Sequence, residues 1–394
     1  MATIKDVAER AGVAPSTVSY VLSGSRKISE DTRRAVHAAI DELGYHPRAS
    51  ARTLRSARTD VIALAVPRVP GEYRAVDGRF AIDITDAARG HGYDVLLMTD
   101  LDGVGGLRRV ARSGLADGAV LMAVEEDDPR IAALRELGFP TALLGHDDHA
   151  ALPWTDLDWE AAVALAVREA AAAGHRRVVF LASAEHEIDA RRGYALRGLD
   201  GARQAATETG TEVRVVESHR EPAVLGRRLR EALGYPCPST GSGVPGPRPS
   251  AGSSGTPYGA PTALVAQHLT LLPHILDAVP GHLAVIPVGS LPDDLGVRNL
   301  PRIDLPVAEM STAVARLAVE AITAAAGPRP AAAGGAAAPG TANAPTGSAL
   351  TTEPPHHLIP PRMSGPAVAP PRAPKPDSEP KPGSEPDSGL EPDP

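Results

Sequence analysis

Apolar residues in the first 43 positions recur at three- and four-residue spacing in three segments, which is the period of an amphipathic helix. Gly12 lies between the first two segments, where glycine takes a positive φ without steric cost, and Pro15 suits the first turn of a new helix. The pattern predicts a helix, a tight turn and a second helix. Their apolar stripes are Ile4, Val7, Ala8 and Ala11, and then Val18, Val21 and Leu22.

The third segment predicts a helix from about Glu30 to Leu43. Ser29 is the expected N-cap, and Gly44 is the expected C-terminal stop. Its apolar stripe would close a small three-helix core and consists of Ala35, Val36, Ala39, Ile40 and Leu43.

The second helix leaves small or hydrogen-bonding side chains for its outer side, namely Ser16, Thr17, Ser19 and Tyr20. Such groups approach base edges and phosphates, and two short helices with this punctuation are typical of a helix-turn-helix whose second helix enters the DNA major groove. A generic three-helix bundle does not explain this polar face.

Residues 3–58 resemble the DNA-binding headpiece of the LacI/GalR family of transcriptional repressors. The matching motifs are T-I-K-D-V-A, A-G-V-A-x-S-T-V-S-x-V-L and E-x-T-R-x-x-V-x-x-A-I-x-E-L-G-Y-x-P. The resemblance implies a dimer that reads two half-sites of an operator in double-stranded DNA. We expect base contacts from Ser16, Tyr20 and Pro15, phosphate contacts from Thr17 and Ser19, and further DNA contacts from Thr3 and Arg26.

Residues 45–58 are basic and rich in small side chains, and Leu54 is the single large aliphatic residue among them. In the family the equivalent segment, here about 48–56, is a hinge helix that folds on operator DNA. The resemblance implies that Leu54 wedges between base pairs in the minor groove, that Ala51 permits close approach, and that Arg52 and Arg55 contact DNA. Alternatively, Leu54 is a linker residue packed on the next domain.

Residues 59–368 alternate strand-like apolar runs with helical patterns, which predicts parallel sheets covered by helices. The resemblance implies an α/β core of two parallel-sheet subdomains, like the periplasmic sugar-binding proteins, with an effector cleft between them. Together with residues 1–58, the predicted fold is an all-α helix-turn-helix headpiece followed by this core. Expected helices are 81–89, 107–112, 129–137, 159–173, 197–207 and 310–325.

The expected effector cleft departs from the family pattern. An arginine usually stands three residues before a Gly-aromatic pair, but here Ala195 precedes Gly198-Leu199. The remaining candidates for effector binding are Asp158, Arg192, Arg197 and Asp294. Asp158 is equally suited to cap a helix. The effector would be a sugar, a nucleoside or another metabolite; alternatively, the protein has lost small-molecule control.

Low-complexity segments interrupt and follow the core. Residues 236–261 and 327–350 are rich in Gly, Pro, Ala and Ser, and are predicted to be flexible insertions. Residues 369–394 are predicted to form a disordered Pro-rich acidic tail. The tail lacks the leucine heptads of a tetramerising coiled coil, so a homodimer is expected.

Charge is divided unevenly along the 394 residues. Residues 1–58 hold ten Lys/Arg and six Asp/Glu, which gives them a net charge of +4. Because the net charge of the whole chain is −8, residues 59–394 carry a net charge of −12. This division suits a DNA reader attached to an acidic body. The single cysteine, the absence of an apolar secretory segment and the absence of a membrane-length apolar run predict a cytoplasmic protein without membrane contact.

Other chemistry finds little support. Two histidine-containing segments could suggest a metal site, namely His146-Asp147-Asp148-His149 and His356-His357. Polar loops after strands are ordinary, however, so no metal and no cofactor are expected. Phosphate-loop, C-x-x-C, H-E-x-x-H and G-x-S-x-G motifs are absent from the sequence, which argues against an enzyme. A solute-binding protein would require an export signal and leaves residues 1–58 without a role. The sequence therefore predicts a dimeric DNA-binding repressor.

Overall fold

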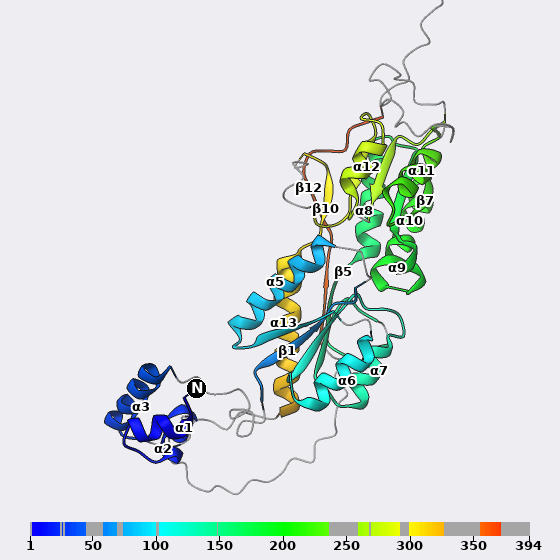
Figure 1. The fold of residues 1–394 in the computed structure, drawn as a ribbon. Coiled ribbons are helices and arrows are strands. Elements are labelled where there is room, and N and C mark those ends of the chain that lie inside the picture. Colours follow the sequence, from blue (N-terminus) through cyan, green and yellow to red (C-terminus); the bar gives the residue numbers. More distant parts are fainter. Residues whose placement is uncertain are drawn as a thin grey trace, which may run out of the picture. The chain divides into compact units, whose positions relative to one another are not determined.

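The computed structural model describes eleven ranges of the chain. These are residues 2–23, 26, 28–44, 58–68, 74–99, 102–147, 149–235, 259–267, 269–291, 299–326 and 355–371. The chain divides into two compact units (Figure 1). Unit 1 comprises Met1–Trp159, His186–Arg197 and Leu305–Pro361, and unit 2 comprises Glu160–Glu185, Gly198–Asp304 and Arg362–Pro394.

Three helices form the headpiece: α1 (Ile4–Arg10), α2 (Pro15–Ser23) and α3 (Glu30–Leu43). Their bounds confirm the predicted helix-turn-helix and third helix, including the start of α2 at Pro15. The buried core consists of Val7, Ala8, Val18, Val36 and Ala39. Ala35 is exposed, so its assignment to the apolar stripe of α3 was wrong. The buried face of α3 is narrower than the spacing of its apolar residues suggests.

The headpiece helices begin and end at the capping residues that the sequence predicts. The hydroxyl of Ser29 accepts a hydrogen bond from the backbone of Thr32, and Gly44 ends α3 in the left-handed conformation at φ 55°. Gly12 takes φ 65° in the turn between α1 and α2. Because a Cβ is costly at positive φ, Gly12 fixes where the chain turns between α1 and α2, and Gly44 fixes where α3 ends.

Unit 1 contains a six-stranded parallel sheet in the order β11-β5-β4-β3-β1-β2. Its strands are β1 (Val61–Ala65), β2 (Asp94–Met98), β3 (Gly118–Met122), β4 (Thr141–Leu144), β5 (Trp154–Leu157) and β11 (His356–Ile359). The run of fully buried residues in β1, β3 and β4 is expected of a parallel sheet covered on both faces.

Helices cover both faces of this sheet (Figure 1). On one face, α6 (Gly103–Ser113) and α7 (Pro129–Glu136) bury Leu107 and Leu134 against Ala63 and Ala65 of β1. On the other lie α5 (Ala75–Gly90) and α13 (Val307–Ala326). Gly118 permits this packing, since a Cβ there would lie 2.6 Å from Cγ1 of Ile322 on α13.

Unit 2 is built on a four-stranded parallel sheet in the order β7-β6-β8-β9. Its core packs Leu225 and Leu229 of one helix and Ile275 of another against the sheet. Strands β10 and β12 form a separate antiparallel pair. The elements are α8 (Trp159–Ala172), β6 (Arg177–Ala184), α9 (Glu185–Asp189), α10 (Gly193–Thr209), β7 (Glu212–Ser218), α11 (Pro222–Ala232), β8 (Ala263–Ala266), α12 (Leu272–Ala278), β9 (Ala284–Pro287), β10 (Arg302–Asp304) and β12 (Arg362–Ser364), of which α8, α9 and α10 begin or end in unit 1.

The all-α headpiece and the two parallel-sheet units confirm the predicted fold class. Four helices begin earlier than expected: α5 at Ala75 rather than 81, α6 at Gly103 rather than 107, α10 at Gly193 rather than 197, and α13 at Val307 rather than 310. In α6 the glycines at 103, 105 and 106 hide the helical pattern, while the carboxylate of Asp102 caps the helix by accepting from the backbone of Gly105. Strand β5 and helices α9, α11 and α12 are among the elements that were not predicted.

Several predicted segments lie outside the described residues. They are the hinge at about 48–56, nearly all of the insertion at 236–261, the insertion at 327–350 and the tail beyond residue 371. The domain boundaries at 58 and 368 stay predictions. Within the described ranges, no helix combines the length and hydropathy needed to cross a membrane.

Gly201 offers a test of the packing in unit 2. A Cβ at this position of α10 would overlap the backbone carbonyl of Glu160 in α8. We expect Gly201→Ala to lower the free energy of unfolding by about 1–3 kcal/mol, because two helix backbones must separate. Gly90→Ala is the matched control, since nothing lies within 4 Å of its Cβ. Equal urea midpoints for both variants would contradict this packing.

Candidate DNA-binding face and ligand cavity

The exposed side of α2 brings together three of the predicted DNA contacts. Ser16 and Tyr20 lie one helical turn apart and are both exposed, and Pro15 beside them is exposed too. The guanidinium of Arg26 lies over the ring of Tyr20, with Cζ 5.7 Å from the ring centroid. A cation over an aromatic face is attracted to it, so the two side chains support one another at the surface.

Two other predicted contacts are placed differently. Ser19 is buried, with 4% of its surface exposed, so the expectation that it lies on the outer side was wrong. Each residue advances about 100° around a helix, which puts Ser19 beside the buried stripe that contains Val18. Thr17 is half-buried. The DNA contacts assigned to these two residues from the resemblance stay predictions.

Thr3 is exposed but its hydroxyl serves the start of α1. It accepts from the backbone of Asp6, and the carboxylate of Asp6 accepts from the backbone N–H of Thr3 at 2.7 Å. This second hydrogen bond is the main reason that the pKa of Asp6 lies below its usual range. Four further predicted DNA contacts, Ala51, Arg52, Leu54 and Arg55, lie outside the described residues.

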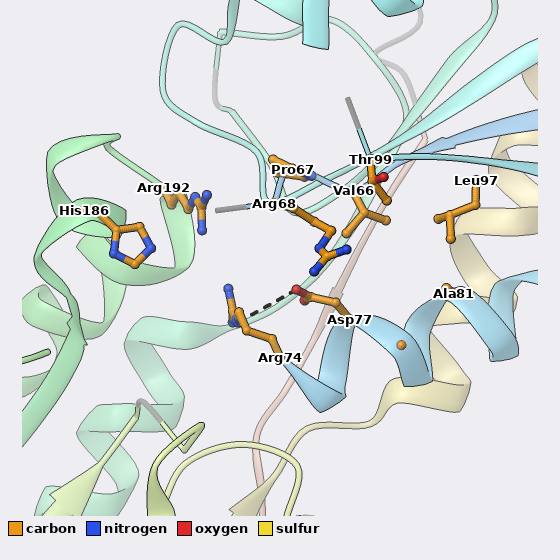
Figure 2. A pocket seen from close by; sticks show the side chains of 11 residues that line it. Val66, Pro67, Arg68, Arg74, Asp77, Ala81, Leu97, Thr99, His186 and Arg192 are labelled. Atoms are coloured by element: carbon orange, nitrogen blue, oxygen red, sulfur yellow. Dashed lines mark ion pairs between the residues drawn. The ribbon is translucent and has the colours of Figure 1, made fainter. Parts of the chain in front are cut away.

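A cavity of about 180 Å³ lies at the carboxyl ends of β1 and β2 in unit 1 (Figure 2). One water requires roughly 10–15 Å³ on this measure, so the cavity has room for a small molecule. Its polar walls come from the segment after β1, the start of α5, the segment after β2, and the α9–α10 region. The lining residues are Val66, Pro67, Arg68, Arg74, Asp77, Gly78, Ala81, Leu97, Thr99, His186 and Arg192.

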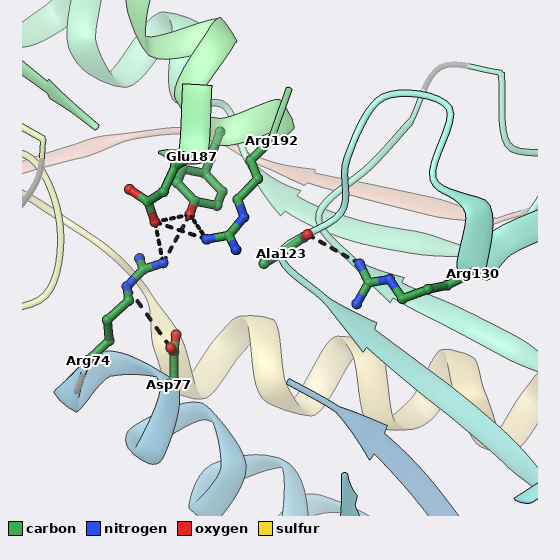
Figure 3. A network of polar contacts seen from close by, with 7 residues as sticks. Arg74, Asp77, Ala123, Arg130, Glu187 and Arg192 are labelled. Atoms are coloured by element: carbon green, nitrogen blue, oxygen red, sulfur yellow. Dashed lines mark hydrogen bonds and ion pairs between the residues drawn. The ribbon is translucent and has the colours of Figure 1, made fainter. Parts of the chain in front are cut away.

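Behind one wall, the carboxylate of Glu187 is completely buried and is shared by two arginines (Figure 3). Its Oε1 lies 2.6 Å from Nη1 of Arg74 and 3.1 Å from Nη1 of Arg192. The hydroxyl of Tyr194 donates to the same oxygen at 2.5 Å, and accepts from both arginines. A buried carboxylate requires this kind of compensation.

The protonation states follow from these contacts. Burial raises the pKa of Tyr194 to about 12, so its phenol is neutral and donates to Glu187. Burial alone would lower the pKa of Arg74, but Tyr194, Glu187 and Asp77 outweigh it and raise that pKa. The pKa of Arg192 is raised in the same way, against burial, by Tyr194 and Glu187. Both arginines therefore carry their charge at neutral pH.

The predicted effector residues separate into two groups. Arg192 lines the cavity. Arg197 does not line the cavity. It stands one turn inside α10, where its guanidinium donates to the carbonyl of His146 and lies 3.8 Å from the carboxylate of Asp156. Asp158 is half-buried just before α8 and is also not among the lining residues. Asp294 lies outside the described residues, and these effector roles stay predictions.

Sequence reasoning missed Arg74, Asp77, Glu187 and Tyr194. The pair Arg192–Tyr194 is visible as R-R-G-Y at 191–194, next to the arginines already considered. No local pattern connects this motif to Arg74, which is 113 positions before Glu187.

The histidines considered for a metal site form a different arrangement. His146 stacks on Trp154 with ring centroids 4.3 Å apart, and His356 stacks on the same Trp154 at 5.0 Å. Nδ1 of His146 lies 2.9 Å from Oδ2 of Asp156. In the described part of the chain, which excludes Asp148, no three His, Cys, Asp or Glu side chains are placed to hold a metal ion.

Comparisons with known proteins show what the headpiece is similar to. Residues 3–48 match a family model described as "Bacterial regulatory proteins, lacI family". The HTH-type transcriptional regulator MalR of Streptococcus pneumoniae is 32% identical over 161 residues, which are 40% of this chain and 49% of MalR. The chain thus matches about half the length of this relative. MalR is a transcriptional regulator, which agrees with the prediction that the chain is not an enzyme.

Two solved structures share the fold of most of the chain. A lac repressor dimer bound to operator and the anti-inducer ONPF has a TM-score of 0.68 at 18% identity, covering 94% of this chain and 99% of that chain. A complex of the transcriptional regulator CelR with cellobiose has a TM-score of 0.56 at 22% identity, covering 93% and 100%. At these identities the likeness supports the fold alone.

Glu187→Gln tests the buried network. The substitution keeps the shape of the side chain but leaves Arg74 and Arg192 charged without their shared carboxylate. We expect a loss of about 3–5 kcal/mol in the free energy of unfolding, measured by urea denaturation. Glu136→Gln is the control, because its ion pair with Arg108 is exposed and such pairs contribute about 0–1 kcal/mol. A loss for Glu187→Gln no larger than for this control would refute the network's importance.

Proposed function

We propose that this chain, a member of the lacI family of bacterial regulatory proteins by its residues 3–48, is a dimeric, sequence-specific DNA-binding repressor. One headpiece of the dimer reads each half of a near-palindromic operator in double-stranded DNA. The observation that carries this proposal is the exposed face of α2, the second helix of a helix-turn-helix, where Ser16 and Tyr20 stand together and Arg26, which follows the helix, lies over Tyr20.

In this proposal the residues on that face contact different parts of the DNA. Ser16 and Tyr20 contact base edges, Pro15 gives an apolar base contact, and Arg26 reaches a phosphate from its position over Tyr20. The net charge of +4 on residues 1–58 supports the affinity for the DNA backbone. Leu54 is the minor-groove wedge, with Ala51, Arg52 and Arg55 beside it.

Apolar side chains on unit 1 support the dimer. Ile82 on α5 is 62% exposed, and Leu97 on β2 is 52% exposed. Strand β2 is one of the two edge strands of the six-stranded sheet. A second copy of the chain would remove these side chains from water, which is the main favourable term in association.

A small-molecule effector in the cavity of unit 1 is the proposed control. Ligand binding that favours one arrangement of the core shifts the population of the operator-binding state. The related structures are named for an anti-inducer and for cellobiose, which supports this mode of control. We place the protein in the cytoplasm, where a bacterial operator is accessible.

A regulator without small-molecule control is the second candidate. Two observations favour it: Ala195 stands at the family's arginine position, and Glu187 already occupies one side of Arg74 and Arg192. Selection of bound sites from random DNA, followed by a metabolite screen for release, separates the two candidates. Release by a metabolite supports effector control. A specific site that no metabolite releases supports the second candidate.

Tyr20→Ala tests the recognition face at the selected site. We expect it to weaken specific binding by about 1–3 kcal/mol, while binding to bulk DNA stays within experimental error. His37→Ala is the control, since His37 is exposed and belongs to α3 rather than to α2. Both affinities are measured by fluorescence anisotropy over a range of salt concentrations, and both should fall steeply with salt. An equal loss on specific and bulk DNA would contradict a base contact.

Leu54→Ala tests the wedge. The variant should lose specific affinity far more than non-specific affinity, because only the kinked operator accepts the side chain between base pairs. Leu115→Ala, at a leucine that is 49% exposed in unit 1, is the matched control. The same loss of affinity for both DNA classes would identify Leu54 as an ordinary linker residue.

A further inference from the structure

We propose that the cavity of unit 1 binds an anionic small molecule, one that carries a phosphoryl or carboxylate group, and that Arg68, Arg74 and Arg192 hold this group. The inference rests on the proposed function, because it names the chemical class of the effector.

The balance of charge around the cavity favours an anion. Among the described lining residues, three guanidinium groups face one carboxylate, that of Asp77. Glu187 behind the wall compensates one of the arginines, so this group of five side chains still carries an excess of one positive charge. In Figure 2 the side chains of Arg68, Arg74 and Arg192 approach the same space from three segments of the chain.

Two donors at the cavity lack acceptors. Nε of Arg74 and Nε of Arg192 are buried and have no hydrogen-bond partner within the described structure. Oδ2 of Asp77 lies 4.0 Å from Nε of Arg74, which is too far for a hydrogen bond. The side chain of Arg192 is only 8% exposed, so water does not easily supply the missing acceptor. A small rotation of either guanidinium would present this donor to an oxygen of a bound ligand.

The start of α5 adds to this preference. The helix has 16 residues, and Arg74 at its N-cap position supplies no side-chain acceptor for the first backbone N–H groups. Asp77, Gly78 and Ala81 of this helix line the cavity. The positive end of a helix dipole stabilises an anion beside it, so the helix acts in the same sense as the three arginines.

The same features argue against a neutral sugar as the preferred ligand. Hydroxyl groups accept hydrogen bonds from guanidinium but bring no charge, so the excess positive charge would stay uncompensated in a partly dry site. Phosphoryl and carboxylate groups match the planar fork of arginine with two parallel hydrogen bonds. Apolar residues such as Val66, Pro67 and Ala81 would contact the uncharged part of the molecule.

Calorimetry on the full chain tests this proposal with three probes: inorganic phosphate, citrate and the neutral sugar glucose, all at constant ionic strength. Phosphate and citrate separate a phosphoryl from a carboxylate preference. Arg68→Gln is the informative variant, because Arg68 is exposed and takes no part in the network around Glu187, so its loss leaves the fold intact. Arg112→Gln, exposed on α6 and outside the cavity, removes the same charge elsewhere.

We expect at least one anion to bind the wild-type chain more tightly than glucose, about tenfold more weakly to Arg68→Gln, and unchanged to Arg112→Gln. Anion binding that Arg68→Gln does not alter would be an adventitious ion only, for example on the basic headpiece, and would overturn the proposal. Glucose binding tighter than both anions, or no binding of either anion, would overturn it too. DNA selection is independent of these titrations, so failure of the proposed function would appear there separately.

Discussion

The compensation of one buried charge, the carboxylate of Glu187, determines how the cavity of unit 1 is built. A carboxylate without exposed surface must be paired, and here two arginines and a tyrosine hydroxyl converge on it. Arg74 begins α5, whereas Arg192 and Tyr194 flank the start of α10. The pairing therefore holds two segments of unit 1 together that are more than a hundred positions apart, and leaves further cationic groups facing the cavity.

Stability alone does not explain this arrangement. Buried ion pairs lose about as much through desolvation as they gain from attraction, and apolar side chains of similar volume would serve the fold equally well. What the ionic arrangement provides is a fixed direction for each guanidinium, at a site with room for a small molecule. The headpiece follows the opposite strategy: it keeps its charged groups exposed and relies on five small buried residues, two glycine turns and side-chain caps.

The sequence predicted the local features of this protein well and the long-range ones poorly. Pro15, Ser29 and Gly44 each act on the backbone within a few residues, so the start of α2 and both ends of α3 could be placed to the residue. The parallel sheets followed from strands whose apolar runs are continuous. Ser19 was misplaced because the edge of a helical stripe depends on what packs against it. The partners of Glu187 could not be found, since nothing in a short pattern specifies a contact across the chain.

The pairing of β11 with β5 bears on how the chain is made. Both the edge strand β11 and the helix α13 that covers one face of the sheet come from residues 307–359, after most of unit 2. A ribosome adds roughly 5–20 residues per second, so β1 to β5 emerge many seconds before the segments that complete their sheet. During that interval the nascent polypeptide presents an uncovered apolar surface, and chaperones that act at the ribosome are the cellular means of shielding it.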